Sequence, residues 1–363
     1  MESLKELKIG GLSTYPNLVL APMSGVTNSC FRRLMREENP QAIGLLVTEF
    51  ISIEGLTRGN LKSRRMMEFR LEEKPISIQI FGHDIDRMVD AAKMVEDEGA
   101  DIVDINSGCP VPKVVKRGGG CELMRHPLHL GSLLEKVAKA VSIPLTLKIR
   151  SGWDDNSLNA PEIARIAEES GVKMLAVHGR TRQQLYRGVS DWDIVERISR
   201  ERSIPVVGSG DVNNLESAKS ALKRGVAGVM IGRGAMENPW IFSDIYKGIH
   251  EDTNEGLQRY GHGFSRPYSE IIRLLFRYLE LLLDDGPDST ALGRMKQLIS
   301  QCTRNIPDST VLRKELCTSR DIPTLKDRLS YWGDRLEKIP GSVYANLRMD
   351  RREQFANDQL FTS

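Results

Sequence analysis

Short apolar runs recur along the first two thirds of the chain, each followed by a polar or glycine-containing loop and then an amphipathic stretch. These runs are rich in Val, Ile and Leu and mostly do not alternate with polar residues, which is typical of strands buried on both faces of a parallel sheet. The eight runs span residues 17–23, 43–50, 75–82, 100–106, 144–150, 172–179, 204–210 and 226–232.

The stretches between the runs have helical spacing. Residues 84–98 carry apolar side chains three and four positions apart, with Asp84 placed to cap the first turn. Residues 161–171 and 214–225 are further helical candidates. Strands alternating with helices predict a (β/α)8 TIM barrel over residues 1–245. A doubly wound sheet is the alternative, but the GxGxxG turn that its nucleotide-binding form needs after the first strand is missing.

The pattern changes after residue 245. Residues 246–267 are largely polar and glycine-rich and predict a linker. Residues 268–338 keep helical periodicity without strand signals, so we expect a small all-α domain there. Residues 339–363 read as a loosely attached C-terminal tail.

Composition narrows the function classes without choosing one. The 363 residues are 40% hydrophobic and 28% charged, as in ordinary globular proteins. The formal net charge is +2, so a nucleic-acid binder would have to gather its basic residues on one face. The five cysteines show no metal-ligand spacing, which predicts reduced thiols and no metal site. No signal-peptide pattern or membrane-length apolar run is present, so we expect a cytoplasmic protein without membrane contact.

Residues with chemical potential follow nearly every predicted strand. In a barrel, the loops after the strands gather at one rim, where active sites lie. The residues at these strand ends are Pro22, Met23, Glu49, Gln79, Asn106, Cys109, Lys148, His178, Ser209, Gly210, Asp211, Gly232 and Arg233.

The last two strands end in Gly-Ser-Gly-Asp (208–211) and Gly-Arg-Gly (232–234). Both loops offer unhindered backbone N–H groups, at the place where many such barrels bind a phosphate. These glycines would alternatively serve only to make tight turns. Their occurrence after both of the last two strands favours a phosphate-bearing cofactor, with Arg233 as an ion-pair partner.

Lys148 and Cys109 are the two most reactive candidates. Lys148 ends a buried strand, and its ammonium would stabilise an anionic ligand such as reduced flavin; a salt bridge with Glu49 or Asp104 is the alternative. Cys109 stands in a Gly-Cys-Pro loop that holds its thiol over the barrel mouth, where it could act as an acid or a nucleophile. The alternative is an inert thiol, as we expect for Cys30, Cys302 and Cys317.

Several segments together resemble the bacterial tRNA-dihydrouridine synthases. They include LAPMSGVTNSCFRRL (20–34), ADIVDINSGCPVPKVVKRGGGCELMRHP (100–127), VHGRTRQQLYRGVSDWD (177–193) and GVMIGRGAMENPWIF (228–242). The resemblance covers about residues 9–245, in order and spacing. It implies FMN bound by Pro22, Met23, Ser24, Gln79, Lys148, His178, Ser209, Gly210, Asp211, Gly232 and Arg233.

The resemblance also implies a reaction. Specific uridines in tRNA would be reduced at their 5,6-double bond, by hydride transfer from reduced FMN to C6 and protonation of C5 by Cys109. NADPH would reduce the flavin again, visiting the same mouth in turn with the RNA. The helical domain occupies the place of the family's RNA-binding domain. The RNA contacts would come from Asn106 on the uracil and from Lys113, Arg180, Arg182, Tyr186, Arg294, Lys296 and Arg304.

Two departures from the family's pattern concern the binding sites. Ser209 replaces an amide in the phosphate loop, although the backbone N–H groups remain. In the helical domain, Gln301 and Cys302 stand where relatives carry an aromatic pair. The alternatives are therefore dihydrouridine formation in another RNA such as rRNA, an FMN barrel acting on free pyrimidines, and a non-catalytic RNA-binding module.

Overall fold

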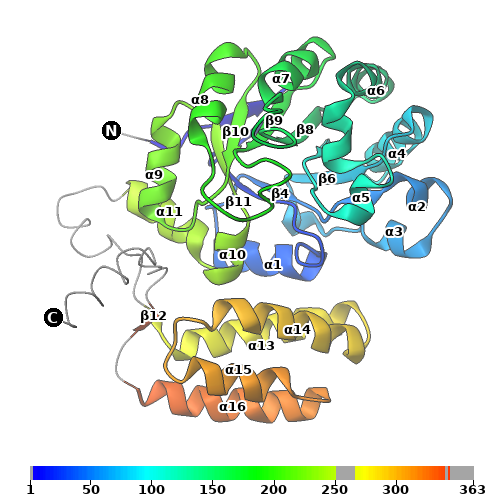
Figure 1. The fold of residues 1–363 in the computed structure, drawn as a ribbon. Helices are drawn as coiled ribbons and strands as arrows, with labels where there is room; N and C mark the ends of the chain where they lie inside the picture. The colour runs from blue at the N-terminus through cyan, green and yellow to red at the C-terminus, as the bar shows by residue number, and fades with distance from the viewer. Residues whose placement is uncertain (1–2, 251–265, 340–341, 344–363) are drawn as a thin grey trace.

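A closed barrel of eight parallel strands forms the centre of the protein (Figure 1). The computed structural model describes residues 3–250, 266–339 and 342–343. The barrel closes because β4 pairs with both β3 and β6, and the short strand β5 (Ile51–Ser52) extends the edge of β6. Its strands are β3 (Leu18–Leu20), β4 (Leu45–Val47), β6 (Ile76–Phe81), β7 (Ile102–Ser107), β8 (Leu145–Arg150), β9 (Met174–His178), β10 (Val206–Ser209) and β11 (Gly228–Ile231). Seven lie within the predicted runs, and β7 extends one residue beyond its run of 100–106, to Ser107. The predicted TIM barrel is confirmed.

Helices surround the barrel, and the cap expected at Asp84 is present. Asp84 accepts a hydrogen bond from the N–H of Arg87 at the start of α4, and Asn214 caps α9 through the N–H of Ser217. The helices are α1 (Ser29–Glu38), α2 (Ile53–Thr57), α3 (Leu61–Arg65), α4 (Ile85–Asp97), α5 (Pro112–Val115), α6 (Pro127–Ala140), α7 (Ala160–Glu169), α8 (Trp192–Glu201), α9 (Leu215–Lys223), α10 (Arg233–Glu237) and α11 (Ile241–His250). Two 3₁₀ turns, η1 (Leu71–Glu73) and η2 (Gly120–Arg125), complete the loops.

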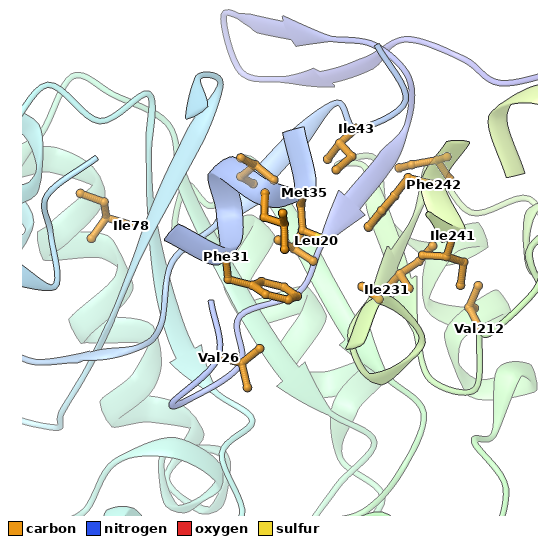
Figure 2. Packing of buried hydrophobic residues seen from close by; sticks show 14 of the residues in the cluster. Leu20, Val26, Phe31, Met35, Ile43, Ile78, Val212, Ile231, Ile241 and Phe242 are labelled. Atoms are coloured by element: carbon orange, nitrogen blue, oxygen red, sulfur yellow. The ribbon is translucent and has the colours of Figure 1, made fainter. Parts of the chain in front are cut away.

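Helix α11 continues to His250, five residues beyond the expected end of the barrel unit at 245. It continues because Ile245 and Ile249 lie on the same buried face as Ile241 and Phe242. Figure 2 shows Ile241 and Phe242 packing beside β11, while Phe31 and Met35 of α1 face Leu20 of β3. Residues 251–265 of the proposed linker and most of the proposed tail lie outside the described residues, whereas Arg266 and Pro267 at the end of the linker form a short strand.

A hairpin of β1 (Leu7–Ile9) and β2 (Leu12–Thr14) fills the barrel at the N-terminal ends of the strands. Its Leu7 and Ile9 join the inward-facing Leu45, Ile102 and Met174 in a separate apolar cluster. Sequence analysis did not predict this hairpin, because strands of three residues are too short to show a period. The hairpin leaves the opposite end of the barrel for polar side chains.

The expected helical domain packs beneath α1 and α10 (Figure 1). It consists of α13 (Ser269–Asp285), α14 (Asp288–Cys302), α15 (Ser309–Cys317) and α16 (Ile322–Glu337). The rings of Phe31 and Tyr278 meet edge to face at 6.2 Å, and Arg273 holds both carboxylate oxygens of Glu38. A two-residue ladder joins β12 (Arg266–Pro267) to β13 (Ser342–Val343). In the part of the chain that the structure describes, no helix is long and apolar enough to cross a membrane.

Candidate active site

Polar side chains line the barrel interior at the carboxyl ends of the strands. Alternate residues of a strand point to opposite faces, so Leu147 and Ile149 pack against the helices while Thr146 and Lys148 face inward. On β9, Ala176 belongs to the inner cluster and places His178 on the same face. The rim therefore gathers side chains from strands that are far apart in sequence.

A buried network joins three of these strands. The Gln79 amide donates to Oδ2 of Asp104 at 2.6 Å and accepts from Nδ2 of Asn106 at 2.7 Å. Asp104 also accepts from the hydroxyl of Thr146. Burial raises the pKa of Asp104 to about 6, against the lowering effect of these donors and of Lys148. Gln79 is thus held in one orientation, with one N–H left to donate.

Asn106 orders the loop that carries Cys109. Its Oδ1 accepts the backbone N–H of Cys109 at 2.8 Å and that of Gly108 at 3.1 Å. With Nδ2 already donating to Gln79, the amide has one N–H to offer the uracil that we expected it to hold. That role stays a prediction, and the structure adds a second role in which Asn106 positions the thiol.

The Cys109 thiol lies at the rim and is only 6% exposed. Burial raises the pKa of Cys109, outweighing the backbone N–H of Val111 and the charges of Arg150 and Lys148. The thiol is therefore protonated at neutral pH. A proton donor needs this form, whereas a nucleophile needs the thiolate. Cys121 is a second buried thiol nearby, and its N–H donates to the carbonyl of Cys109.

Lys148 is the cation of the inner rim. Within the described residues its ammonium has neither a hydrogen bond nor a carboxylate at ion-pair distance, so the salt-bridge alternative with Glu49 or Asp104 is not formed. Glu49 instead accepts from the N–H of Gly25 and pairs with Arg294 at 3.4 Å. Burial, followed by the charge of Arg150, lowers the pKa of Lys148 to about 8, against the attraction of Asp104. A cation without a direct partner fits an anionic or hydrogen-bond-accepting ligand.

His178 is held neutral. Burial, and then the positive charges of Lys148, Arg150 and Arg180, lower the pKa of His178 well below its ordinary value. Its Nε2 lies 3.4 Å from Arg180, whose guanidinium binds both carboxylate oxygens of Asp211 at 2.7 Å. A neutral imidazole offers one donor and one acceptor to a ligand.

The two glycine loops present free backbone donors, as expected for a phosphate site. In the described part of the chain, the N–H groups of Gly210, Asp211 and Gly232 have no hydrogen-bond partner. Gly210 has φ +123°, and a Cβ there would stand 2.2 Å from the hydroxyl of Ser190, so this turn requires glycine. Arg233 is 3.2 Å from Asp211, so its charge is shared with that carboxylate. These donors fit a phosphate-bearing group, and the buried Ser209 directly precedes them in the chain.

The first βα loop approaches the same place. Gly232 packs against Met23, since a Cβ built there would lie 3.5 Å from the Met23 sulfur. The N–H of Met23 is taken by the hydroxyl of Thr27 at 3.0 Å. Pro22 is half-buried and Ser24 is exposed. Their predicted contact with the flavin remains a prediction.

Arg150 is a site residue that sequence analysis missed. Its guanidinium donates to the carbonyls of Gly108, Thr181 and Leu185 at 2.7–3.0 Å, so it ties the Cys109 loop to the loop after β9. The only available signal was its position at the last residue of a buried strand. It was overlooked because hydrogen bonds from a side chain to distant backbone carbonyls leave no pattern in the sequence.

The proposed RNA contacts fall into two groups. Lys113 and Tyr186 are exposed and Arg182 is partly exposed, and neither Lys113 nor Arg182 has an ion-pair partner in the described residues. Arg180 is only 2% exposed and binds Asp211, so it braces its loop. Arg294 donates to the carbonyl of Gly25 and pairs with Glu49, which ties α14 to the barrel. Lys296 is partly exposed, and the exposed Arg304 is 3.8 Å from Glu237.

The departure at 301–302 looks different in the structure. Cys302 is buried in the helical domain beside Ile299 and Leu298, and burial raises its pKa to about 12. It is a core position and not a surface one, whereas Gln301 is partly exposed.

A pocket lined by Gly10, Gly11, Ser142 and Lys173 lies at the N-terminal ends of the strands, away from the polar rim. Among the residues described, no group of three or more His, Cys, Asp or Glu side chains could hold a metal ion.

The mouth of this barrel holds a protonated thiol, a lysine without a direct partner and free backbone donors. This combination is typical of a TIM-barrel enzyme that binds an anionic ligand. The family model described as "Dihydrouridine synthase (Dus)" matches residues 19–324. The chain belongs to the dihydrouridine synthase family.

Curated relatives are similar over most of their length. A "Probable tRNA-dihydrouridine synthase" of Rickettsia conorii is 36% identical over 329 residues, covering 89% of this chain and 95% of the relative. One of Rickettsia prowazekii is 43% identical, covering 89% and 96%. "tRNA-dihydrouridine synthase B" of Pseudomonas syringae pv. tomato is 40% identical over 281 residues, covering 77% and 80%. A solved morphinone reductase aligns at 13% identity and a TM-score of 0.47 over 68% of this chain and 90% of its own, too low to carry an argument.

Proposed function

We propose that this protein reduces uridines in tRNA to dihydrouridine, using a flavin as its redox group. The observation that carries the proposal is the Cys109 thiol, kept protonated at a rim that also holds the unpaired Lys148 and a set of free backbone N–H groups. Membership of the dihydrouridine synthase family and the names of its relatives support the same activity.

The flavin is FMN in this proposal, because the free N–H groups at the ends of β10 and β11 form one compact set that suits a single phosphate. Gly210, Asp211 and Gly232 would hold the phosphate through their N–H groups, with Ser209 and Arg233 beside them. Gln79, Lys148 and His178 would hold the ring and ribityl chain, and the loop of Pro22, Met23 and Ser24 would cover it. When bound and reduced, a flavin supplies a hydride, which C6 of uracil accepts.

Cys109 would donate its proton to C5 of the same base. A thiol with a raised pKa keeps that proton at neutral pH, and Asn106 fixes the loop that carries the thiol. Lys148 would keep its positive charge facing the ligand below pH about 8. The buried side of the rim limits the access of water to both groups.

The RNA must present its uridine unstacked, because Cys109 is only 6% exposed and a base stacked in a helix does not reach its thiol. Lys113, Arg182 and Tyr186 stand on the loops around the rim, and Lys296 and Arg304 on the helical domain would contact the backbone. Arg180 and Arg294 would act indirectly, by holding these surfaces in place. NADPH is the proposed reductant, reaching the flavin in the absence of RNA.

Turnover by the purified holoenzyme with NADPH tests this function. Unmodified tRNA, rRNA and free uridine are supplied separately, and dihydrouridine is measured by mass spectrometry of the nucleosides. We expect the product in tRNA alone, with NADPH preferred over NADH. Product from free uridine but not from RNA would replace the proposal with a free-pyrimidine reductase, and a protein that binds no flavin would reject both.

A further inference from the structure

A tryptophan at the rim is held against two arginines that come from neighbouring loops. The Arg125 guanidinium is 4.6 Å from the centroid of the Trp153 ring, and that of Arg182 is 4.8 Å from it. Both distances are well inside the range of cation–π attraction. We call Arg125, Trp153 and Arg182 the arginine clamp.

Hydrogen bonds fix the three loops that supply the clamp. The N–H of Arg182 donates to the carbonyl of Gly152 at 2.9 Å, and the N–H of Gln183 donates to that of Trp153 at 3.0 Å. Asn159 donates to the carbonyl of Met124 at 2.7 Å, next to Arg125. Gly152 is required, since a Cβ there would be 2.0 Å from the carbonyl oxygen of Ser157. The clamp is therefore built into the rim.

The charge of Arg182 is not neutralised by any carboxylate among the described residues. Its Nε is buried without a hydrogen-bond partner in that part of the chain, and its side chain makes no ion pair there. Arg125 is paired with Glu122 at 3.2 Å, but half of its side chain is exposed. By contrast, the nearby Arg180 is saturated by Asp211 and two carbonyls. The clamp keeps a net positive charge in fixed positions.

Two guanidiniums beside one ring repel each other, and Glu122 offsets the charge of Arg125 alone, so the charge of Arg182 is left for an anion to complete the group. The negative face of the indole attracts each guanidinium. The terminal N–H groups of Arg182 make no hydrogen bond within the described residues and stay available to a ligand. A phosphate matches this arrangement, because its oxygens accept paired N–H donors from arginine. The exposed Lys113, Lys116 and Arg117 continue the positive surface on the loop after β7.

We propose that the arginine clamp binds one phosphodiester of the RNA next to the uridine that enters the barrel. This inference rests on the proposed function for the identity of the RNA. Arg150 connects the clamp loop to the Cys109 loop through the carbonyls of Thr181 and Gly108, so a phosphate bound there positions the strand relative to the thiol. Trp153 acts as a positioning residue that orders the two guanidiniums.

Salt-dependent binding of tRNA to the holoenzyme tests the clamp with Arg182→Gln, Trp153→Leu and Trp153→Phe. Arg165→Gln is the matched control, since Arg165 is a half-exposed arginine of α7 paired with Glu169. We expect Arg182→Gln to weaken binding about tenfold and to lower the slope of log affinity against log salt by about 1, as for one lost phosphate contact. Trp153→Leu weakens binding about threefold to tenfold, and Trp153→Phe, which keeps an aromatic face, weakens it less. The flavin spectrum and the rate of flavin reduction by NADPH stay at wild-type values in all variants.

Arg182→Gln that matches Arg165→Gln in affinity and salt slope would overturn the proposal. A raised KM for NADPH with unchanged tRNA binding would also overturn it, since the phosphate would then belong to the reductant. If wild-type protein makes no dihydrouridine while the salt slope still depends on Arg182, the proposed function fails and the clamp stands. If dihydrouridine forms with an unchanged KM for tRNA in Arg182→Gln and Trp153→Leu, the clamp fails and the function stands.

Discussion

At the residue scale, burial shifts the pKa values of two groups in the site away from their ordinary values. Burial raises the pKa of Cys109 and lowers that of Lys148 to about 8, so the thiol keeps its proton at a pH where the amine begins to lose one. His178 stays neutral for the same reason, with four cationic side chains around it. Each shift follows from placing polar groups at the inner end of buried strands.

The lowered pKa of Lys148 predicts a pH dependence of flavin affinity. Below pH about 8 the ammonium is charged and would donate a charge-assisted hydrogen bond to an acceptor atom of the flavin ring, and as the pH rises through about 8 the charge and this stronger bond are lost. We expect the affinity of the apoprotein for FMN to fall across this range, measured by flavin fluorescence. Lys148→Met should bind more weakly at neutral pH and show no such fall. A wild-type affinity that is flat across the range contradicts the role of Lys148.

Asp104 should set the position of that transition. Its carboxylate raises the pKa of Lys148, so Asp104→Asn removes a negative charge and shifts the fall in FMN affinity to lower pH. Thr146→Val is the control, because it removes a hydrogen bond to Asp104 and leaves the charge. The same titration measures both variants. If the pH midpoint of FMN affinity moves equally in Asp104→Asn and Thr146→Val, the shift comes from the lost hydrogen bond and not from the charge of Asp104.

At the scale of elements, the sequence predicted the strands and helices that are long enough to show hydrophobic periodicity. The eight strands followed from the buried runs, and the start of α4 followed from the capping residue Asp84. The β1–β2 hairpin was missed, because its strands are too short to show a period. Lys148 and Cys109 could be singled out because they stand at strand ends. Arg150 and Trp153 could not be assigned a role, because their contacts join loops that only the closed barrel brings together.

Helix α14 is fixed to the barrel by Arg294, which was expected to contact RNA. Removing it leaves the nearly buried Glu49 with only the N–H of Gly25, so Arg294→Gln should lower the free energy of unfolding by about 1–2 kcal/mol. Lys296→Gln, one position from Met295 on the same helix, should change it by less than about 0.5 kcal/mol. Urea unfolding followed by circular dichroism makes the comparison. Equal effects of the two variants would remove the argument for an interdomain contact.

At the scale of the whole molecule, the barrel and the helical domain share one apolar core. Phe31 on the barrel side and Tyr278 on the helical side belong to the same cluster, and Glu37 and Glu38 bind arginines of α13. The balanced net charge hides a basic patch, since several arginines of the outer helices are paired within one turn. At the rim, Lys113 and Arg182 have no ion-pair partner among the described residues. A rigid arrangement of this kind would present the RNA to the thiol in one orientation.

The most direct test of the account is the Cys109→Ala holoenzyme, with Cys121→Ala as the matched variant of a neighbouring buried thiol. Flavin reduction by NADPH and dihydrouridine formation in tRNA are measured on the same preparations. The account predicts that Cys109→Ala binds and reduces its flavin normally while dihydrouridine formation falls at least about a hundredfold, as for the loss of a general acid. Cys121→Ala keeps both activities. Dihydrouridine formation at the wild-type rate in Cys109→Ala would contradict the assignment of this thiol as the proton donor.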